Sequence, residues 1–183
     1  MSNKDGVSKF LSLILRHKPE EIGIQLDQHG WANVAELISK MGENGTILTM
    51  GKLENIVETD SKGRYSFNHD KTLIRANQGH SIKVDLELKP VEPPEVLYHG
   101  TADRFIDSIM KSGLKPISRN HVHLSSDIET ALKVGKRHGK AIILTINAQE
   151  MALKGHKFYI STNGVWLTDA VPTEFIEVTK LGS

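Results

Sequence analysis

The sequence contains no cysteine, and this absence excludes disulfide bonds and thiolate metal ligands. It also lacks any apolar run near the ~20 residues that a membrane-spanning helix needs. The start of the chain is polar and is not followed by the apolar segment of a secretory signal. We therefore expect a cytoplasmic protein that has no contact with a membrane.

Neither half of the chain has a large excess of one charge. Residues 1–90 contain 12 Lys and Arg against 12 Asp and Glu, and residues 91–183 contain 11 against 10. Non-specific binding to a polyanion requires a broad basic surface, so it does not account for the whole function. Phosphate contacts must instead come from a few positioned side chains. The candidates are Arg16, His17, Arg75 and Arg119.

The first half of the chain predicts three short helices followed by a β-hairpin. The first helix covers residues 5–17, where apolar side chains recur every three or four positions. Asn33 and Thr49 are typical N-caps for the other two helices. The hairpin is expected over residues 64–76. This order is typical of a winged helix, which often binds nucleic acid, although the fold alone does not show that it does.

Three connecting segments also carry predictions. Residues 22–26 alternate between apolar and polar, as in a short strand. Residues 27–30 are typical of a turn, and we expect this turn to place Trp31 in the core. Residues 77–81 form a polar loop that could bind an anion or a ribose, although ordinary surface loops have the same composition.

A proline-rich segment marks the boundary between two domains. Residues 89–94 contain three of the six prolines, and such a segment acts as a stiff, extended spacer. We place a first domain at residues 1–88, a linker at 89–95 and a second domain at 96–183.

The second domain is predicted as an α+β fold, with short, mainly antiparallel strands flanked by helices. The expected strands cover residues 96–99, 122–124, 141–146, 158–161, 165–167 and 175–178. One helix is expected over 103–112 with Phe105 and Met110 inside, and another starts at Ser126 or Asp127.

Two histidine runs in this domain are candidates for a ligand site. They are His99-Gly100-Thr101 and His121-Val122-His123-Leu124-Ser125-Ser126. Each places histidine in a short strand, followed by small or hydroxyl residues that let a ligand approach the backbone. Alternatively, the first run is a strand-to-helix turn in which Thr101 caps the next helix. His123 could equally be a half-buried strand residue that bonds to a backbone carbonyl.

The first predicted helix ends on Arg16, His17 and Lys18. Cations at a helix C-terminus are favoured by the helix dipole and need no ligand. The same cations are suited to bind an anion, so both interpretations stay open.

Three familiar motifs do not fit. Residues 135–140 resemble a phosphate-binding loop, but the glycines are one residue too close and no Ser or Thr follows Lys140. No Gly-x-Gly-x-x-Gly follows a strand. His121 and His123 share one strand face, but no third ligand stands at a recognisable spacing, so we expect no metal.

Four runs of the sequence resemble the RNA 2′-phosphotransferases, enzymes that remove a 2′-phosphate from spliced RNA using NAD+. The runs are Ser12-Leu13-Ile14-Leu15-Arg16-His17-Lys18-Pro19, Ile74-Arg75-Ala76-Asn77-Gln78-Gly79-His80-Ser81, Leu97-Tyr98-His99-Gly100-Thr101 and His121-Val122-His123-Leu124-Ser125. They occur in the same order along nearly the whole chain, which makes the resemblance specific. It implies a winged-helix RNA-binding lobe followed by an ADP-ribosyltransferase-like lobe that binds NAD+.

The resemblance also implies roles for individual residues. The implied catalytic set is Arg16, His17, Arg75 and Arg119. The implied NAD+ contacts are His99, Gly100, Thr101, His123, Leu124, Ser125, Ser126 and Val165. Many protein-modifying ADP-ribosyltransferases have a glutamate at the position that resembles Val165, so transfer to a protein side chain is not expected.

The implied reaction consumes NAD+ as a co-substrate and passes through an ADP-ribosylated RNA phosphate. Its products are RNA with a 2′-hydroxyl, nicotinamide and ADP-ribose 1″,2″-cyclic phosphate. Two other functions stay open at this point: an ADP-ribosyltransferase that caps terminal phosphates of nucleic acids, and a non-enzymatic winged-helix protein that senses NAD+. The expected partners are an RNA with a 2′-phosphate and NAD+, and we expect a monomer.

Overall fold

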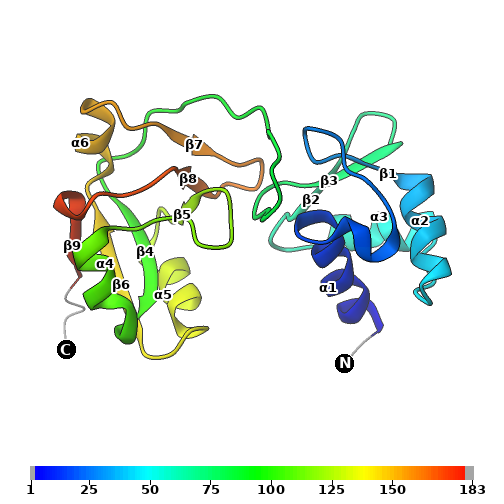
Figure 1. Cartoon of the computed structure of the whole chain (residues 1–183), viewed down its shortest axis with the longest axis horizontal. Helices are drawn as coiled ribbons and strands as arrows, with labels where there is room; N and C mark the ends of the chain where they lie inside the picture. The colour runs from blue at the N-terminus through cyan, green and yellow to red at the C-terminus, as the bar shows by residue number, and fades with distance from the viewer. Residues whose placement is uncertain (1–2, 180–183) are drawn as a thin grey trace. The chain divides into compact units, whose positions relative to one another are not determined.

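The computed structural model describes residues 3–179 and separates the chain into two compact units, residues 1–87 and 88–183. Both units combine helices with small antiparallel sheets (Figure 1), which confirms the α+β class. Across residues 3–179, no helix is long and apolar enough to cross a membrane.

The first unit packs three helices on a three-stranded antiparallel sheet. The helices are α1 (Asn3–Arg16), α2 (Val34–Glu43) and α3 (Met50–Thr59), and the strands are β1 (Ala32–Asn33), β2 (Tyr65–Phe67) and β3 (Leu73–Ala76). The strand order is β1-β3-β2. Side chains from every helix and from β3 form the core, including the fully buried Leu11, Leu37, Leu53 and Ile74. The predicted helices and hairpin are confirmed, whereas β1 was not predicted.

Side-chain caps start α2 and α3. The Asn33 Oδ1 accepts a hydrogen bond from the Glu36 amide (2.9 Å), and the Thr49 Oγ1 accepts one from the Lys52 amide (3.2 Å). Each cap satisfies an amide that has no partner within its own helix. Both predicted cap positions are confirmed.

Two predictions for the segment between α1 and α2 are wrong. Pro19–Ile22 forms a 3-10 helix, η1, which ends at Gly23 with a φ of 73°. This turn disrupts the expected strand over 22–26, and no strand is assigned there. Trp31 is only partly buried, because its ring lies beneath the guanidinium of Arg75 rather than in the core.

The second unit contains two antiparallel sheets, ordered β4-β6-β9 and β5-β8-β7. The strands are β4 (Leu97–Ala102), β5 (Val122–Leu124), β6 (Ala141–Ile146), β7 (Phe158–Ile160), β8 (Trp166–Thr168) and β9 (Ile176–Val178). The helices are η2 (Asp103–Phe105), α4 (Ile106–Ser112), α5 (Ile128–Lys136), α6 (Ala148–Leu153) and η3 (Thr173–Phe175). Every predicted strand of this unit is present, whereas α6 was not predicted.

Strand β4 is longer than predicted. It continues through Gly100 and Thr101 to Ala102, so the interpretation of this run as a strand-to-helix turn is wrong. Thr101 does not cap the following helix, because η2 starts after Ala102 and has no side-chain cap. Phe105 and Met110 were expected inside but are 41% and 40% exposed.

Helix α5 packs directly against β4 (Figure 1). A Cβ atom on Gly100 would collide with the carbonyl oxygen of Ala131, and a Cβ on Gly135 would lie 2.8 Å from the carbonyl oxygen of Thr101. Only glycine allows two backbones to approach this closely. The Asp127 side chain caps α5, which confirms one of the two predicted starts.

Candidate functional site

In the first unit, Arg16 and His17 lie at the C-terminal end of α1 and contact the loop at residues 77–81. Arg16 is buried, and its Cζ and Nε lie 3.3 Å from where a Cβ on Gly79 would be. The Ser81 amide donates to the carbonyl oxygen of Arg16 (3.0 Å), and the Ser81 Oγ lies 2.8 Å from the His17 Nδ1. The helix end and the loop therefore form one local structure. The helix dipole alone does not explain why the Arg16 side chain is enclosed by this loop.

Arg75, on β3, is held by an aromatic ring and a turn. Its Cζ lies 4.5 Å from the centre of the Trp31 ring, and its Nη1 lies 3.5 Å from the carbonyl oxygen of His29. His29 belongs to the turn predicted over 27–30, which is confirmed by the hydrogen bond from the Gly30 amide to the Asp27 carbonyl. A guanidinium stacked on an indole has a restricted orientation, so its donors point in defined directions.

The loop that follows β3 is polar and yet buried. Asn77, Gln78 and His80 expose only 4%, 9% and 2% of their surface. Among the residues that the structure describes, the Asn77 Oδ1, the Gln78 Oε1, the His80 Nε2 and the Arg75 Nε are buried without a hydrogen-bond partner. Buried polar atoms are normally hydrogen-bonded, and a polar ligand would supply such partners. An ordinary surface loop does not account for this burial.

The electrostatics of His80 show that these groups lie close together. Burial, together with the charges of Arg16, His17 and Arg75, lowers the pKa of His80 to about 4. His80 is therefore neutral at pH 7. Positive charges gathered around a buried neutral ring favour the binding of an anion. The first unit thus brings together three members of the predicted catalytic set.

In the second unit, the two histidine runs are joined by a side-chain hydrogen bond. The His99 Nδ1 donates to the carbonyl oxygen of His123 (2.9 Å). Because a carbonyl only accepts, this bond fixes the proton on Nδ1 and leaves Nε2 of the neutral ring as an acceptor. Burial lowers the pKa of His99, which favours the neutral ring. His99 therefore has an acceptor suited to a hydroxyl group.

Arg119 lies in the loop before β5 and contacts the second histidine. Its Nη1 donates to the Nδ1 of His123 (2.8 Å), because a guanidinium has no acceptor. The surrounding protein lowers the pKa of Arg119, and the charge of Arg137 lowers it further, although arginine remains charged at neutral pH. The second unit thus brings Arg119, His123 and His99 together.

Backbone pairing places the remaining predicted residues near the histidines. The amides of Tyr98 and Ser125 each donate to the other's carbonyl oxygen at 2.8 Å, which links β4 to the end of β5. Leu124 pairs with Trp166 of β8. Val165 precedes Trp166, so the antiparallel register brings it to the same end as Ser125.

Not every predicted NAD+ contact has a side chain available to a ligand. Gly100 faces α5, and Thr101 and Leu124 are 6% and 2% exposed. Packing explains these three residues without a ligand. Ser126, in contrast, is exposed at the surface.

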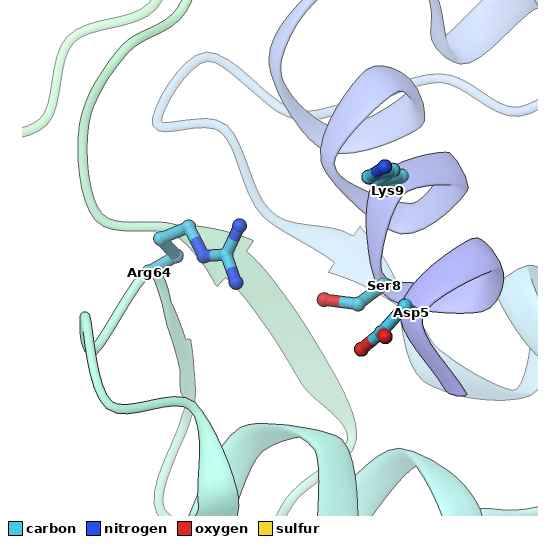
Figure 2. Close-up of a pocket in the computed structure, with 4 residues that line it drawn as sticks. All are labelled: Asp5, Ser8, Lys9 and Arg64. Atoms are coloured by element: carbon cyan, nitrogen blue, oxygen red, sulfur yellow. The ribbon is translucent and has the colours of Figure 1, made fainter. Parts of the chain in front are cut away.

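A separate small pocket lies beside α1 and is lined by Asp5, Ser8, Lys9 and Arg64 (Figure 2). The Arg64 guanidinium is paired with Asp60, with 3.0 Å between Nη2 and Oδ1. None of the predicted site residues lines this pocket, and we attach no function to it.

Sequence reasoning missed His80 as a member of the first cluster. It lies five positions after Arg75 in one of the runs that carry the family resemblance, and that position was the available signal. As for metals, residues 3–179 contain no group of three or more His, Asp or Glu that could hold an ion.

Comparisons with known proteins agree along almost the whole chain. A family model described as "RNA 2'-phosphotransferase, Tpt1 / KptA family" matches residues 2–170. A protein of Fusobacterium nucleatum named "Probable RNA 2'-phosphotransferase" is 56% identical over 178 residues, which cover 97% of this chain and 99% of that protein. Proteins with the same name from Flavobacterium johnsoniae and Hahella chejuensis are 56% and 52% identical over 171 residues, 93% of this chain and 94% and 92% of theirs.

Proposed function

The chain belongs to the RNA 2′-phosphotransferase, Tpt1 / KptA family, and from this premise we propose that it transfers an internal RNA 2′-phosphate to NAD+. The products are RNA with a 2′-hydroxyl, nicotinamide and ADP-ribose 1″,2″-cyclic phosphate. The observation that carries the proposal is the family match over residues 2–170. The side-chain clusters of the two units support it.

In this proposal the first unit is an RNA-binding winged helix and the second an ADP-ribosyltransferase-like lobe that binds NAD+. The element order α1-β1-α2-α3-β2-β3, with an antiparallel β1-β3-β2 sheet, supports the first assignment. The two small antiparallel sheets linked at Tyr98 and Ser125 support the second. Residues 89–95 are the linker.

The RNA 2′-phosphate binds to Arg16 and Arg75. Guanidinium groups bind phosphate through paired, charge-assisted hydrogen bonds. The enclosed position of Arg16 against Gly79 and the stacking of Arg75 on Trp31 support this role, because both restrict how the donors can move. Preorganised donors lose little freedom when the anion binds.

The first chemical step joins the RNA phosphate to the ribose of NAD+. A phosphate oxygen attacks the ribose carbon that bears nicotinamide, and nicotinamide leaves with the bonding electrons. A phosphate dianion is already a competent nucleophile, so this step needs positioning more than a general base. Within the second unit, His99 Nε2 accepts a hydrogen bond from a hydroxyl of NAD+, and His123, Ser125, Ser126 and Val165 contact the same molecule.

The second step releases the RNA. The ribose 2″-hydroxyl attacks phosphorus, and the RNA 2′-oxygen leaves and takes up a proton. Negative charge then increases on the equatorial phosphate oxygens, where guanidinium groups stabilise it. The proposed catalytic arginines are Arg16 and Arg75 of the first unit and Arg119 of the second. His17 is the histidine of this set, and it orients the phosphate or protonates the leaving oxygen.

The test is incubation of the whole chain with an oligonucleotide that carries one internal 2′-phosphate, with and without NAD+. We expect dephosphorylated RNA, nicotinamide and the cyclic phosphate to appear together and only with NAD+. Arg119→Ala should abolish phosphate removal, because one electrostatic donor is worth on the order of a hundredfold or more in rate. An undiminished rate would refute the role of Arg119.

The same assay separates the other two functions. Stable ADP-ribosylated RNA without cyclic phosphate would identify an enzyme that stops after the first step and caps phosphates. Tight RNA binding with no release of nicotinamide would identify a non-enzymatic protein that senses NAD+. Either result contradicts the proposed reaction.

A further inference from the structure

An exposed basic loop connects α5 to β6 in the second unit. Lys136, Arg137, His138 and Lys140 are all exposed. The loop is nevertheless fixed at both ends, because the His138 amide donates to the carbonyl oxygen of Gly135 (3.1 Å) and the Asp103 amide donates to that of Lys140 (3.0 Å). The four basic side chains therefore extend from an anchored backbone into solvent.

The basic groups of this loop differ from the other cations of α5. Lys133, one turn earlier, is paired with Glu129 at 3.2 Å. Within residues 3–179, Lys136, Arg137 and Lys140 form no ion pair. The Asp103 amide contacts the carbonyl oxygen of Lys140, so the Asp103 carboxylate lies near the loop and offsets at most one of its charges. The loop therefore keeps a net positive charge.

The loop lies beside the candidate NAD+ site of the same unit. Ala102 of β4 pairs with Ala141, the first residue of β6 after the loop. His99 precedes Ala102 by three residues, which corresponds to about 10 Å along a strand. The charge of Arg137 contributes to the lowered pKa of Arg119, and the charge of His138 contributes to the lowered pKa of His99. Both effects agree with this proximity.

We infer that the loop at residues 136–140 binds the phosphodiester backbone of single-stranded RNA beside the candidate NAD+ site of the same unit. A distance of about 10 Å is short enough for one RNA strand to contact both the loop and the candidate NAD+ site. Flexible, exposed cations on an open surface fit an extended polyanion and do not select for sequence. This inference rests on the proposed function only for the identity of the RNA as substrate.

The test compares two variants of the whole chain that lose the same charge. Lys136→Gln/Arg137→Gln/Lys140→Gln removes the loop cations. Its control, Lys111→Gln/Lys133→Gln/Lys154→Gln, removes three exposed lysines of the same unit outside the loop. Binding of unmodified single-stranded RNA of about 12 and about 3 nucleotides is measured against salt concentration. The NAD+ KM is measured in parallel.

For the longer RNA, the slope of log affinity against log salt concentration should be smaller in magnitude by about two in the loop variant. Each phosphate contact on a single strand contributes about 0.7 to this slope, and the variant removes three cations. The control should change this slope by less than half as much, and the short RNA should be little affected. An unchanged slope, an equal change in both variants, or a raised NAD+ KM without a slope change would overturn the inference. RNA binding is measured without turnover. If the chain binds RNA through this loop but transfers no phosphate, the proposed function is refuted and the inference about the loop is not.

Discussion

Both units hold a neutral histidine in the candidate site, but they surround it with different groups. In the first, Arg16 and Arg75 place positive charge around His80, whose pKa is about 4. In the second, His99 uses one ring nitrogen to donate to a carbonyl and keeps the other as an acceptor. Concentrated cations are suited to a phosphate, and neutral imidazoles are suited to sugar hydroxyls. This difference supports the proposal that the first unit binds the phosphate and the second binds NAD+.

The largest expected effect is a loss of stability on adding one methyl group to a glycine of the second unit, compared with a glycine of the first. In Gly100→Ala, the new Cβ meets the Ala131 carbonyl oxygen, which is backbone and cannot move without displacing α5 from β4. We expect a loss of roughly 4 kcal/mol or more in the free energy of unfolding, measured by denaturant titration. The control is Gly42→Ala on α2, where nothing lies within 4 Å of the new Cβ. A wild-type unfolding curve for Gly100→Ala would contradict the close packing of α5 on β4.

The next effect concerns the cations of the first unit. Arg75→Gln removes the guanidinium stacked on Trp31, and the rate of 2′-phosphate transfer should fall on the order of a hundredfold or more. Arg64→Gln is the matched control, because Arg64 is paired with Asp60 and takes no part in the proposed reaction. Equal losses in the two variants would show that Arg75 has no special role.

The neutral state of His80 predicts a dependence of stability on pH. Its pKa in the folded protein is about 4, whereas an unperturbed histidine titrates near 6.5. Below about pH 6.5 the unfolded chain binds the proton more readily, so stability is complete above that pH and is lost as the pH falls to about 4. The expected loss is roughly 3 kcal/mol, measured by urea unfolding between those pH values.

A matched pair of variants assigns that loss to one side chain. His80→Gln should weaken the acid destabilisation, because glutamine does not titrate. His69→Gln, at an exposed position, should leave it unchanged. If both variants behave like the wild type across this pH range, His80 is not the group responsible.

The smallest effect concerns the acceptor in the second unit. In His99→Asn, the amide can still donate to the His123 carbonyl but the Nε2 acceptor is lost. The KM for NAD+ should rise about tenfold with little change in kcat, as expected for one lost hydrogen bond to bound substrate. A change confined to kcat would assign His99 to the chemical step instead.

The sequence predicted elements whose signals are local. Asn33 and Thr49 were identifiable as caps because a cap acts on an amide three positions later. The expected strand over 22–26 failed because Pro19–Ile22 forms a 3-10 turn and Gly23 has a positive φ. Helix α6 is only six residues long, too short for a periodic pattern, although Asn147 was an available cap signal.

The site was harder to predict because it depends on contacts between distant residues. Nothing near Arg16 or Arg75 in the sequence indicates that both lie beside His80, and the family resemblance alone connected the two arginines. The tautomer of His99 depends on a carbonyl that folding brings to it. Gly100 was predicted as a ligand contact, but the approach of α5 explains it, and sequence spacing contains no information on that approach.

The most direct test of the account is the affinity of the wild type and of Arg75→Gln for one oligonucleotide with and without its 2′-phosphate, in the absence of NAD+. If the first unit binds the phosphate, the wild type prefers the phosphorylated strand and Arg75→Gln loses that preference while it still binds NAD+. A preference that persists in Arg75→Gln would contradict the assignment of the phosphate to the cluster around His80.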